Sequence, residues 1–370
     1  MTESEVRGDA DYGYVRLLGA PWEGLRQRPQ QLMIQLARYH KVLYVDPPRR
    51  VPRLLPLRRV GGNLWALHPW APSALLGRPR SRAGNHVLAY IVRLGMKLVG
   101  IESPVVWHSE YESWPFIGRL GERLNLYDCC DDFVSLAADP ERAAQEEGEM
   151  LGRADGTIVT SESLLEQKRS RARRILLAPN AADAETFRPS PHLSRPHDLD
   201  GVVRPIIGFV GAFNDWVDTE LVGELARSRR DWSFVVVGPI GAEVTGLRHH
   251  ENVYFLGRKD YENLPAYYAH IDVGIVPFRV SDFTKCIDPI KVYEFLAMGK
   301  PVVATDLPEM RKFGDLILTA RFAREFEERI EEALRTSETV QARRIAWGLE
   351  NSWSHRAAQI ERFIVGAMEG

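Results

Sequence analysis

The feature that most limits the fold of this 370-residue chain is a repeated alternation of short apolar runs with amphipathic stretches. The apolar runs fit buried strands, and several of the stretches between them have the spacing of helices. Strands that alternate with helices need crossover connections, which produce a parallel sheet covered on both faces. In the first half we expect strands at residues 14–18, 42–45, 104–107, 124–127, 157–160 and 175–177, and a helix at 29–39.

The same alternation starts again after residue 205, which indicates a second domain. Here we expect strands at residues 206–210, 233–237, 253–256, 273–276 and 301–304, and helices at 219–227, 262–269, 289–298, 322–334 and within 339–368. The chain length also suits two domains better than one core. We therefore predict an α/β protein of two Rossmann-like, doubly wound domains that face each other across a ligand-binding cleft.

A change in composition marks the boundary between these domains. The segment after Phe187 is rich in proline, histidine and serine, as an exposed connection would be. We predict an N-terminal domain at residues 1–188, a linker at 189–204 and a C-terminal domain at 205–350. A terminal helix is expected at 351–370, and it could pack back on the N-terminal domain.

Composition also indicates the cellular compartment. The three cysteines include an adjacent pair, Cys129 and Cys130, which suits neither a disulfide framework nor a CxxC site and favours a reducing compartment. The first residues are polar and acidic, without the apolar core of a signal peptide, and no apolar run is long enough to span a membrane. We therefore expect a cytoplasmic protein.

The most informative segment, DFTKCIDPIKVYEFLAMGKPVVATD, covers residues 282–306. Asp288 is a suitable N-cap and Pro289 suits the first helical position, so a helix is expected to begin there. The N–H groups and positive dipole end at a helix start can bind an anion such as a diphosphate. Lys291 lies beside that end, and Glu294 falls on the same helix face, where its carboxylate could accept ribose hydroxyls. The spacing alone equally fits an ordinary surface ion pair.

Part of this segment, PIKVYEFLAMGKPVVATDLPE, resembles the donor-site signature of glycosyltransferase family 4 and its relatives, P-x-K-x-x-E-x-x-A-x-G-x-P-V-V. The resemblance implies the two-domain GT-B fold and retaining transfer of a hexose-like residue from a nucleoside diphosphate sugar to an acceptor hydroxyl. It assigns the ribose to Glu294, includes Lys291 in the motif, and implies no metal or other cofactor. Many relatives carry a second glutamate where this chain has Cys286, so the identity of the donor sugar stays open.

Two further segments extend the expected donor site. Gly211 and Ala212 follow a strand, where small residues let a phosphate or sugar approach the backbone, although a plain tight turn is the alternative. Arg258 lies in a run, FLGRKDYENLPAYYAHIDVGIVPF, that also resembles the family, and we expect it to contact the donor. The donor-site candidates are Gly211, Ala212, Arg258, Asp288, Lys291 and Glu294.

The N-terminal half supplies the acceptor-side candidates. Its opening, APWEGLRQRPQQLMIQLARYHKVLYVDPP, resembles that of bacterial family-4-like transferases for surface polysaccharides or teichuronic acid. We expect Trp22, Arg26 and Arg28 to meet the acceptor or the departing diphosphate; solvated arginines are the alternative. The segment NLYDCCDDF resembles the family's Y-D-x-x-D-D-F, and Asp128 and Asp131 could orient an acceptor hydroxyl or cap a helix. No His or Cys spacing supports a metal there.

His108 follows a predicted strand, and related enzymes often place a functional histidine at a comparable point. It could donate hydrogen bonds to the transferred sugar, or it could be structural. The catalytic candidates are therefore His108, Lys291 and Asp131.

Between Asp46 and Glu102 the chain has no acidic residue and ten cations, interleaved with leucine and tryptophan. Such a basic and apolar segment is typical of contact with an anionic leaflet. We predict peripheral membrane contact through residues 49–97, with a solvated loop as the alternative, and a lipid-linked, polysaccharide or small-molecule acceptor. No nucleic-acid-binding module accompanies the charge.

Two other functions fit the same architecture. A nucleotide-sugar epimerase or hydrolase would need no acceptor, and a non-catalytic protein would bind the sugar nucleotide without turnover.

Overall fold

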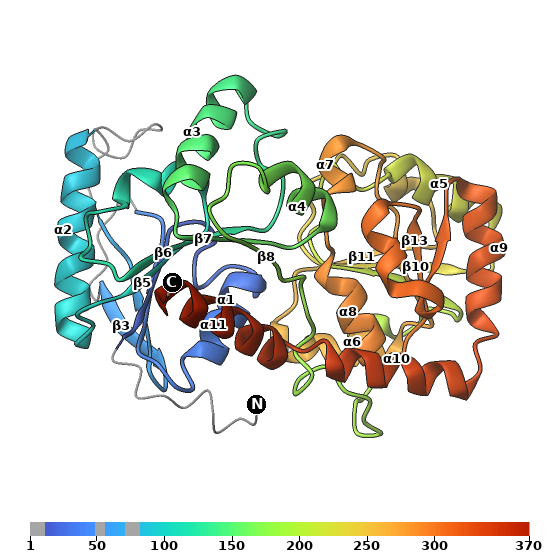
Figure 1. The fold of residues 1–370 in the computed structure, drawn as a ribbon. Coiled ribbons are helices and arrows are strands. Elements are labelled where there is room, and N and C mark those ends of the chain that lie inside the picture. Colours follow the sequence, from blue (N-terminus) through green and yellow to red (C-terminus); the bar gives the residue numbers. More distant parts are fainter. Residues whose placement is uncertain (1–11, 49–55, 71–81, 370) are drawn as a thin grey trace. The chain divides into compact units, whose positions relative to one another are not determined.

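The computed structural model describes residues 12–48, 56–70 and 82–369. The chain forms two compact units, one of residues 1–179 with 354–370 and the other of residues 180–353 (Figure 1). Each is built on a largely parallel sheet, which confirms the predicted α/β class with Rossmann-like sheets. The segment predicted as a linker, 189–204, belongs to the second unit, because Leu199 and Val202 are buried in its core.

Among its described residues the first unit has an eight-stranded sheet. In spatial order the strands are β3 (Leu57–Gly61), β4 (Leu64–Leu67), β2 (Val42–Val45), β1 (Tyr14–Leu17), β5 (Val105–His108), β6 (Leu124–Cys129), β7 (Gly156–Val159) and β8 (Ile175–Leu177). Neighbours are parallel except β3 and β4. This antiparallel hairpin departs from the expected parallel arrangement. It was not predicted, because the exposed Arg58 and Arg59 interrupt the apolar pattern of an edge strand.

Five α-helices of the first unit lie among the described residues. They are α1 (Arg28–Leu36), α2 (Arg82–Val99), α3 (Pro140–Arg153), α4 (Glu162–Lys168) and α11 (Trp353–Glu369). The side chains of Asp139 and Ser161 cap α3 and α4. Within this unit α11 is held by a hydrogen bond between Glu361 and His40 and by one from Arg174 to the carbonyl of Ala367.

The second unit has a six-stranded sheet in which every neighbouring pair is parallel. Its order is β11 (Val253–Gly257), β10 (Ser233–Val237), β9 (Ile206–Val210), β12 (Val273–Val276), β13 (Val302–Thr305) and β14 (Leu318–Ala320). The helices are α5 (Thr219–Ser228), α6 (Leu264–His270), α7 (Asp282–Lys285), α8 (Ile290–Ala297), α9 (Ala323–Leu334) and α10 (Glu338–Glu350). The central strands are buried along their length, as expected when helices cover both faces.

Candidate functional site

The strand order of the second sheet creates a switch point between β9 and β12. The chain steps outward from β9 through β10 to β11, then returns to place β12, β13 and β14 on the other side. In open α/β sheets, ligands bind beyond the carboxyl ends of the strands at such a point. The residues that follow β9 and β12 are therefore where a site is expected.

Glycines lie at the carboxyl ends of β9, β10 and β11. Gly211, Gly238 and Gly257 have φ angles of +126°, +147° and +69°, which residues with side chains rarely adopt. A Cβ atom at Gly238 would lie 1.9 Å from the carbonyl oxygen of Gly211, so the two backbones meet at a distance that only glycine allows. Gly238 and Gly257 were not among the predicted site residues, although each ends an apolar run as Gly211 does.

Lys291 extends from the first turn of α8 to this edge. Its Nζ lies 4.8 Å from the ring centre of Phe209 and 5.1 Å from that of Phe278. Its Cε would lie 3.1 Å from a Cβ atom at Gly211. The structure thus brings two predicted donor residues, Lys291 and Gly211, together at the switch point. The two aromatic faces favour the ammonium group by cation–π attraction.

Glu294 lies one turn further along α8 and is 8% exposed. The hydroxyl of Tyr268 donates a hydrogen bond to its Oε2. Burial raises the pKa of Glu294 to about 7, against the lowering effects of the Tyr268 hydrogen bond and the charge of Lys291; the charge of Asp183 adds to the rise. The carboxylate has further lone pairs, which can accept hydrogen bonds from the hydroxyls of a ligand. Tyr268 was not predicted, because nothing in the sequence joins the tyrosine of α6 to the glutamate of α8.

Asp288 does not cap α8 as predicted. The helix begins at Ile290, and Asp288 is buried in hydrogen bonds from the backbone N–H of Asn180 at 2.6 Å and from the hydroxyl of Tyr293. Lys312 Nζ lies 2.6 Å from its Oδ1. This carboxylate is satisfied inside the protein, and its position favours a structural role in holding the segment at Asn180 against the start of α8.

The other donor-side residues occupy simpler positions. Ala212 is half-buried and follows Gly211, and Arg258 is exposed directly after Gly257. Cys286 is buried and ends the short helix α7.

In the first unit, two acceptor-side candidates form an internal ion pair. Arg28 Nε donates to the Oδ1 of Asp128 at 3.0 Å, and the indole N–H of Trp107 donates to its Oδ2 at 3.1 Å. Arg28 Nη1 also donates to the carbonyl oxygen of Ala178. Arg28 and Asp128 are each 2% exposed. The expectation that they face an acceptor is therefore not met: they tie the start of α1 to the ends of β6 and β8.

His108 is buried at the end of β5, with Nδ1 2.8 Å from Ser113 Oγ and Nε2 3.1 Å from Asn125 Oδ1. Ser113 Oγ donates to the carbonyl of Glu110, so it must accept from Nδ1 of the histidine. Burial lowers the pKa of His108 to about 4. A neutral imidazole that donates from Nδ1 to Ser113 has no proton on Nε2, and Nε2 faces Asn125 in the interior. This buried position does not fit the predicted contact with a sugar.

The remaining acceptor-side candidates lie nearer the surface. Trp22 and Arg26 are half-buried in the loop before α1, and the backbone N–H of Trp22 donates to Asp46 at 2.7 Å. Asp131 is half-buried just beyond β6. These three residues keep their predicted roles as hypotheses.

A buried arginine occupies the switch point of the first sheet, between β1 and β5. Arg16 is 0% exposed, and its guanidinium donates to Ser109 Oγ and to the carbonyl of Ala20, each at 2.9 Å. The turn after β1 contains Leu18 and Gly19 at φ angles of +58° and +83°, and Leu18 is strained there because it has a side chain. Sequence reasoning did not identify Arg16, because an arginine inside a predicted strand gives no sign of its partners.

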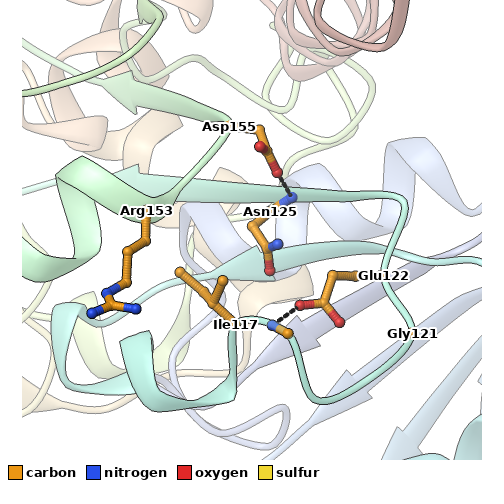
Figure 2. A pocket seen from close by; sticks show the side chains of 7 residues that line it. Ile117, Gly121, Glu122, Asn125, Arg153 and Asp155 are labelled. Carbon is orange, nitrogen blue, oxygen red and sulfur yellow. Dashed lines mark hydrogen bonds between the residues drawn. The ribbon is translucent and has the colours of Figure 1, made fainter.

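A hollow of about 420 Å³ lies elsewhere in the first unit (Figure 2). Asn125 near the start of β6 and Asp155 just before β7 place it toward the amino end of these strands. Its two carboxylates accept backbone hydrogen bonds, Asp155 from Asn125 and Glu122 from Gly118 and Leu120. These acceptors stabilise the hollow's own walls, so we assign it no chemistry.

Three further observations concern metals, membranes and the basic stretch. Within residues 12–48, 56–70 and 82–369, no group of His, Cys, Asp and Glu is arranged to hold a metal ion. No helix in those ranges is long and apolar enough to cross a bilayer. Of the stretch predicted to contact a membrane, residues 49–55 and 71–81 lie outside the described residues.

Comparison with known proteins agrees with this geometry. Residues 204–336 match the family described as glycosyl transferases group 1. A Bacillus subtilis (strain 168) protein named as a teichuronic acid biosynthesis glycosyltransferase, TuaH, is 29% identical over 204 residues. That match covers 50% of this chain and 51% of the relative, so the chain spans about half the length of the curated relative.

Solved structures resemble the chain over almost its whole length. Sucrose-phosphate synthase from Thermosynechococcus elongatus matches with a TM-score of 0.74 and 16% identity, over 96% of this chain and 98% of that one. The Anabaena protein HepE, solved with UDP and glucose, gives 0.68 and 15%, over 96% and 100%. The fold is therefore GT-B, and the match of residues 204–336 to glycosyl transferases group 1 agrees with the resemblance seen in the sequence.

Proposed function

We propose that this chain, which has the GT-B fold and a glycosyl transferases group 1 domain, is a hexosyltransferase-like glycosyltransferase. It transfers a sugar from a nucleoside diphosphate sugar to an acceptor hydroxyl. The observation that carries the proposal is the meeting of Lys291, Gly211 and Glu294 at the switch point of the second sheet. That site lies inside the matched segment 204–336.

Each part of the site has a task in this reaction. The glycine-lined strand ends keep side chains away, so a phosphate or sugar can approach the backbone. Glu294 accepts hydrogen bonds from the ribose hydroxyls in its ionised form. Lys291 places a positive charge where the departing diphosphate gains negative charge, and such preorganised charge lowers the barrier. Holding the donor and the acceptor close together in a reactive orientation lowers the barrier further.

The finer features of the reaction rest on resemblance. Retention of anomeric configuration follows from the family-4 signature, with the acceptor attacking on the face that the diphosphate leaves. A UDP-hexose is the donor we test first, since HepE was solved with UDP and glucose. Cys286 has no carboxylate, so we expect the donor-sugar contact that relatives assign to a glutamate to come from another residue.

For the acceptor we propose a lipid-linked or polysaccharide intermediate of cell-surface glycan or glycolipid synthesis, reached from the cytoplasm. The name of the TuaH relative supports this class. A small-molecule acceptor is the alternative. The chain's own charges suffice for the proposed donor site, so no metal or other cofactor is invoked.

The first test is thermal unfolding with UDP-, GDP-, ADP-, CDP- and TDP-glucose. A ligand at 100 times its Kd stabilises the folded state by roughly 2.7 kcal/mol, so the correct nucleotide should raise the melting temperature clearly. Glu294→Ala should abolish the shift, whereas Glu328→Ala, which changes an exposed carboxylate on α9, should keep it. Absence of a shift with every nucleotide would count against the donor site.

Product analysis then separates the competing functions. A transferase forms a glycosylated product only when an acceptor is present. Release of free sugar or conversion to an epimer without an acceptor would identify a hydrolase or epimerase. Binding of the sugar nucleotide without turnover, with lipid-linked, polymeric and small acceptors alike, would identify a non-catalytic binding protein.

A further inference from the structure

Helix α2 has an exposed apolar stripe on the face opposite its buried one. Leu88, Val92 and Met96 pack into the core of the first unit. On the outer face Val87, Tyr90, Leu94 and Leu98 are 38%, 69%, 49% and 69% exposed. These four residues, hereafter the α2 stripe, are spaced by three, four and four residues, so they lie on one side of the helix. Figure 1 shows α2 along an outer side of the unit.

Such a stripe is unusual on the surface of this chain. Among the described residues, fourteen large apolar side chains are exposed, and four of them belong to this one helix. The stripe runs over about 17 Å at 1.5 Å per residue. Contiguous exposed apolar surface commonly marks a site of contact with a partner or a membrane.

The charges beside the stripe identify the partner. Arg93 and Lys97 are exposed next to it, and α2 carries no acidic residue. The acid-free part of the chain extends from Pro47 to Ile101. A second copy docking through the same stripe would bring like charges together without a carboxylate on either helix to pair with them. An anionic bilayer satisfies both features, because it accepts apolar side chains and attracts cations.

We infer that α2 lies in the headgroup region of an anionic membrane, with the α2 stripe inserted and Arg93 and Lys97 at the phosphate level. Tyr90 suits this depth, because its ring is apolar and its hydroxyl is polar. The inference goes beyond the proposed reaction and does not depend on it. It would hold the transferase at the surface where a lipid-linked acceptor resides.

The test is flotation of the full chain with vesicles of phosphatidylcholine alone or mixed with phosphatidylglycerol. We expect flotation with the mixed vesicles at low salt, weaker flotation at high salt, and almost none with phosphatidylcholine alone. Tyr90→Ser with Leu94→Ser should lower partitioning by roughly tenfold or more. Arg93→Glu with Lys97→Glu should abolish it.

Matched controls alter similar residues elsewhere. Leu349→Ser changes a leucine that is 49% exposed on α10, and Arg324→Glu reverses an exposed cation on α9; both should float like the wild type. Circular dichroism and the nucleotide-induced thermal shift should stay unchanged in the α2 variants, which separates membrane binding from the donor site. Lys291→Ala should still float.

Three results would overturn the inference. They are failure of the wild-type chain to float with phosphatidylglycerol at low salt, wild-type flotation of the Tyr90 and Leu94 double variant, and a concentration-dependent dimer in sedimentation that this double variant abolishes. The last result would assign the α2 stripe to self-association.

Discussion

The two sheets share the order of their central strands, so their switch points can be compared directly. In the second unit the strand ends after β9 and β10 are glycines, and Lys291 and Glu294 approach from α8. In the first unit the corresponding region is filled by the buried Arg16, which bonds across from β1 to Ser109. The difference shows that similar topology can be used in two ways. The strand ends of the second sheet have no side chains of their own beside Lys291, whereas the first sheet uses a charged residue to bind its own loops.

The largest effect on stability is expected in the first unit, from Asp128→Ala. This change leaves the buried Arg28 without its carboxylate, and breaking a buried ion pair costs about 3–5 kcal/mol. Denaturant unfolding would measure the loss, with the exposed Asp282→Ala as the control, which should cost almost nothing. If Asp128→Ala unfolds like the wild type but loses transfer activity, Asp128 belongs to the site after all.

The next effect concerns the strand ends of the second unit. Gly238→Ala would push a Cβ atom against the backbone of Gly211 at a strained φ, and we expect a loss of roughly 3 kcal/mol. Gly246→Ala is the matched control, because nothing lies within 4 Å of its Cβ position and its φ is −61°. Equal melting temperatures for the two variants would contradict the close approach.

The pH dependence of Glu294 supplies a third test. Its pKa is about 7 in the folded state and about 4.5 when unfolded, so the folded protein binds more protons between these values. The free energy of unfolding should therefore fall by about 3 kcal/mol from this group as the pH rises from 4.5 through 7. Glu294→Gln removes the titration, so the difference between its pH profile and that of the wild type isolates the effect. Parallel profiles would mean that Glu294 is not buried as described.

His108 should act in the opposite direction. Its folded pKa of about 4 lies below the unfolded value of 6.5, so the unfolded chain binds more protons between them. Its contribution to the free energy of unfolding should therefore decline by up to about 3 kcal/mol as the pH falls from 6.5 through 4. Replacement by Gln should flatten this acid-side slope in denaturant unfolding. A slope that persists in His108→Gln would assign it to other groups.

Much of the fold follows from the sequence, for a physical reason. The bounds predicted for β9, β10 and β12 match those in the structure, because strands buried on both faces are continuous apolar runs. The β3–β4 hairpin and α2 were not predicted, because exposed arginines interrupt the first and apolar residues on both faces obscure the second. The short edge strand β14 was not predicted either, because its three residues are too few to show an alternating apolar pattern.

The candidate site, like the fold, could be predicted from the sequence only in part. Lys291 and Glu294 could be found because a dense local motif contains them. Tyr268 and Phe209 could not, since their contacts with α8 exist only after three separate segments pack together. Arg28, Asp128 and Asp288 have residue types common in active sites, but a sequence does not show whether a charge faces a ligand or an internal partner.

The switch point of the second unit is where we propose that the nucleoside diphosphate binds. Isothermal titration tests this directly. UDP, or the diphosphate of the donor that gives the largest thermal shift, is titrated into the wild-type, Lys291→Met and Arg324→Met chains, and Arg324 is an exposed cation on α9. We predict at least roughly tenfold weaker binding for Lys291→Met, which corresponds to about 1.4 kcal/mol, with little change in melting temperature, and near wild-type binding for Arg324→Met. Equal affinities of the wild-type and Lys291→Met chains would contradict the account.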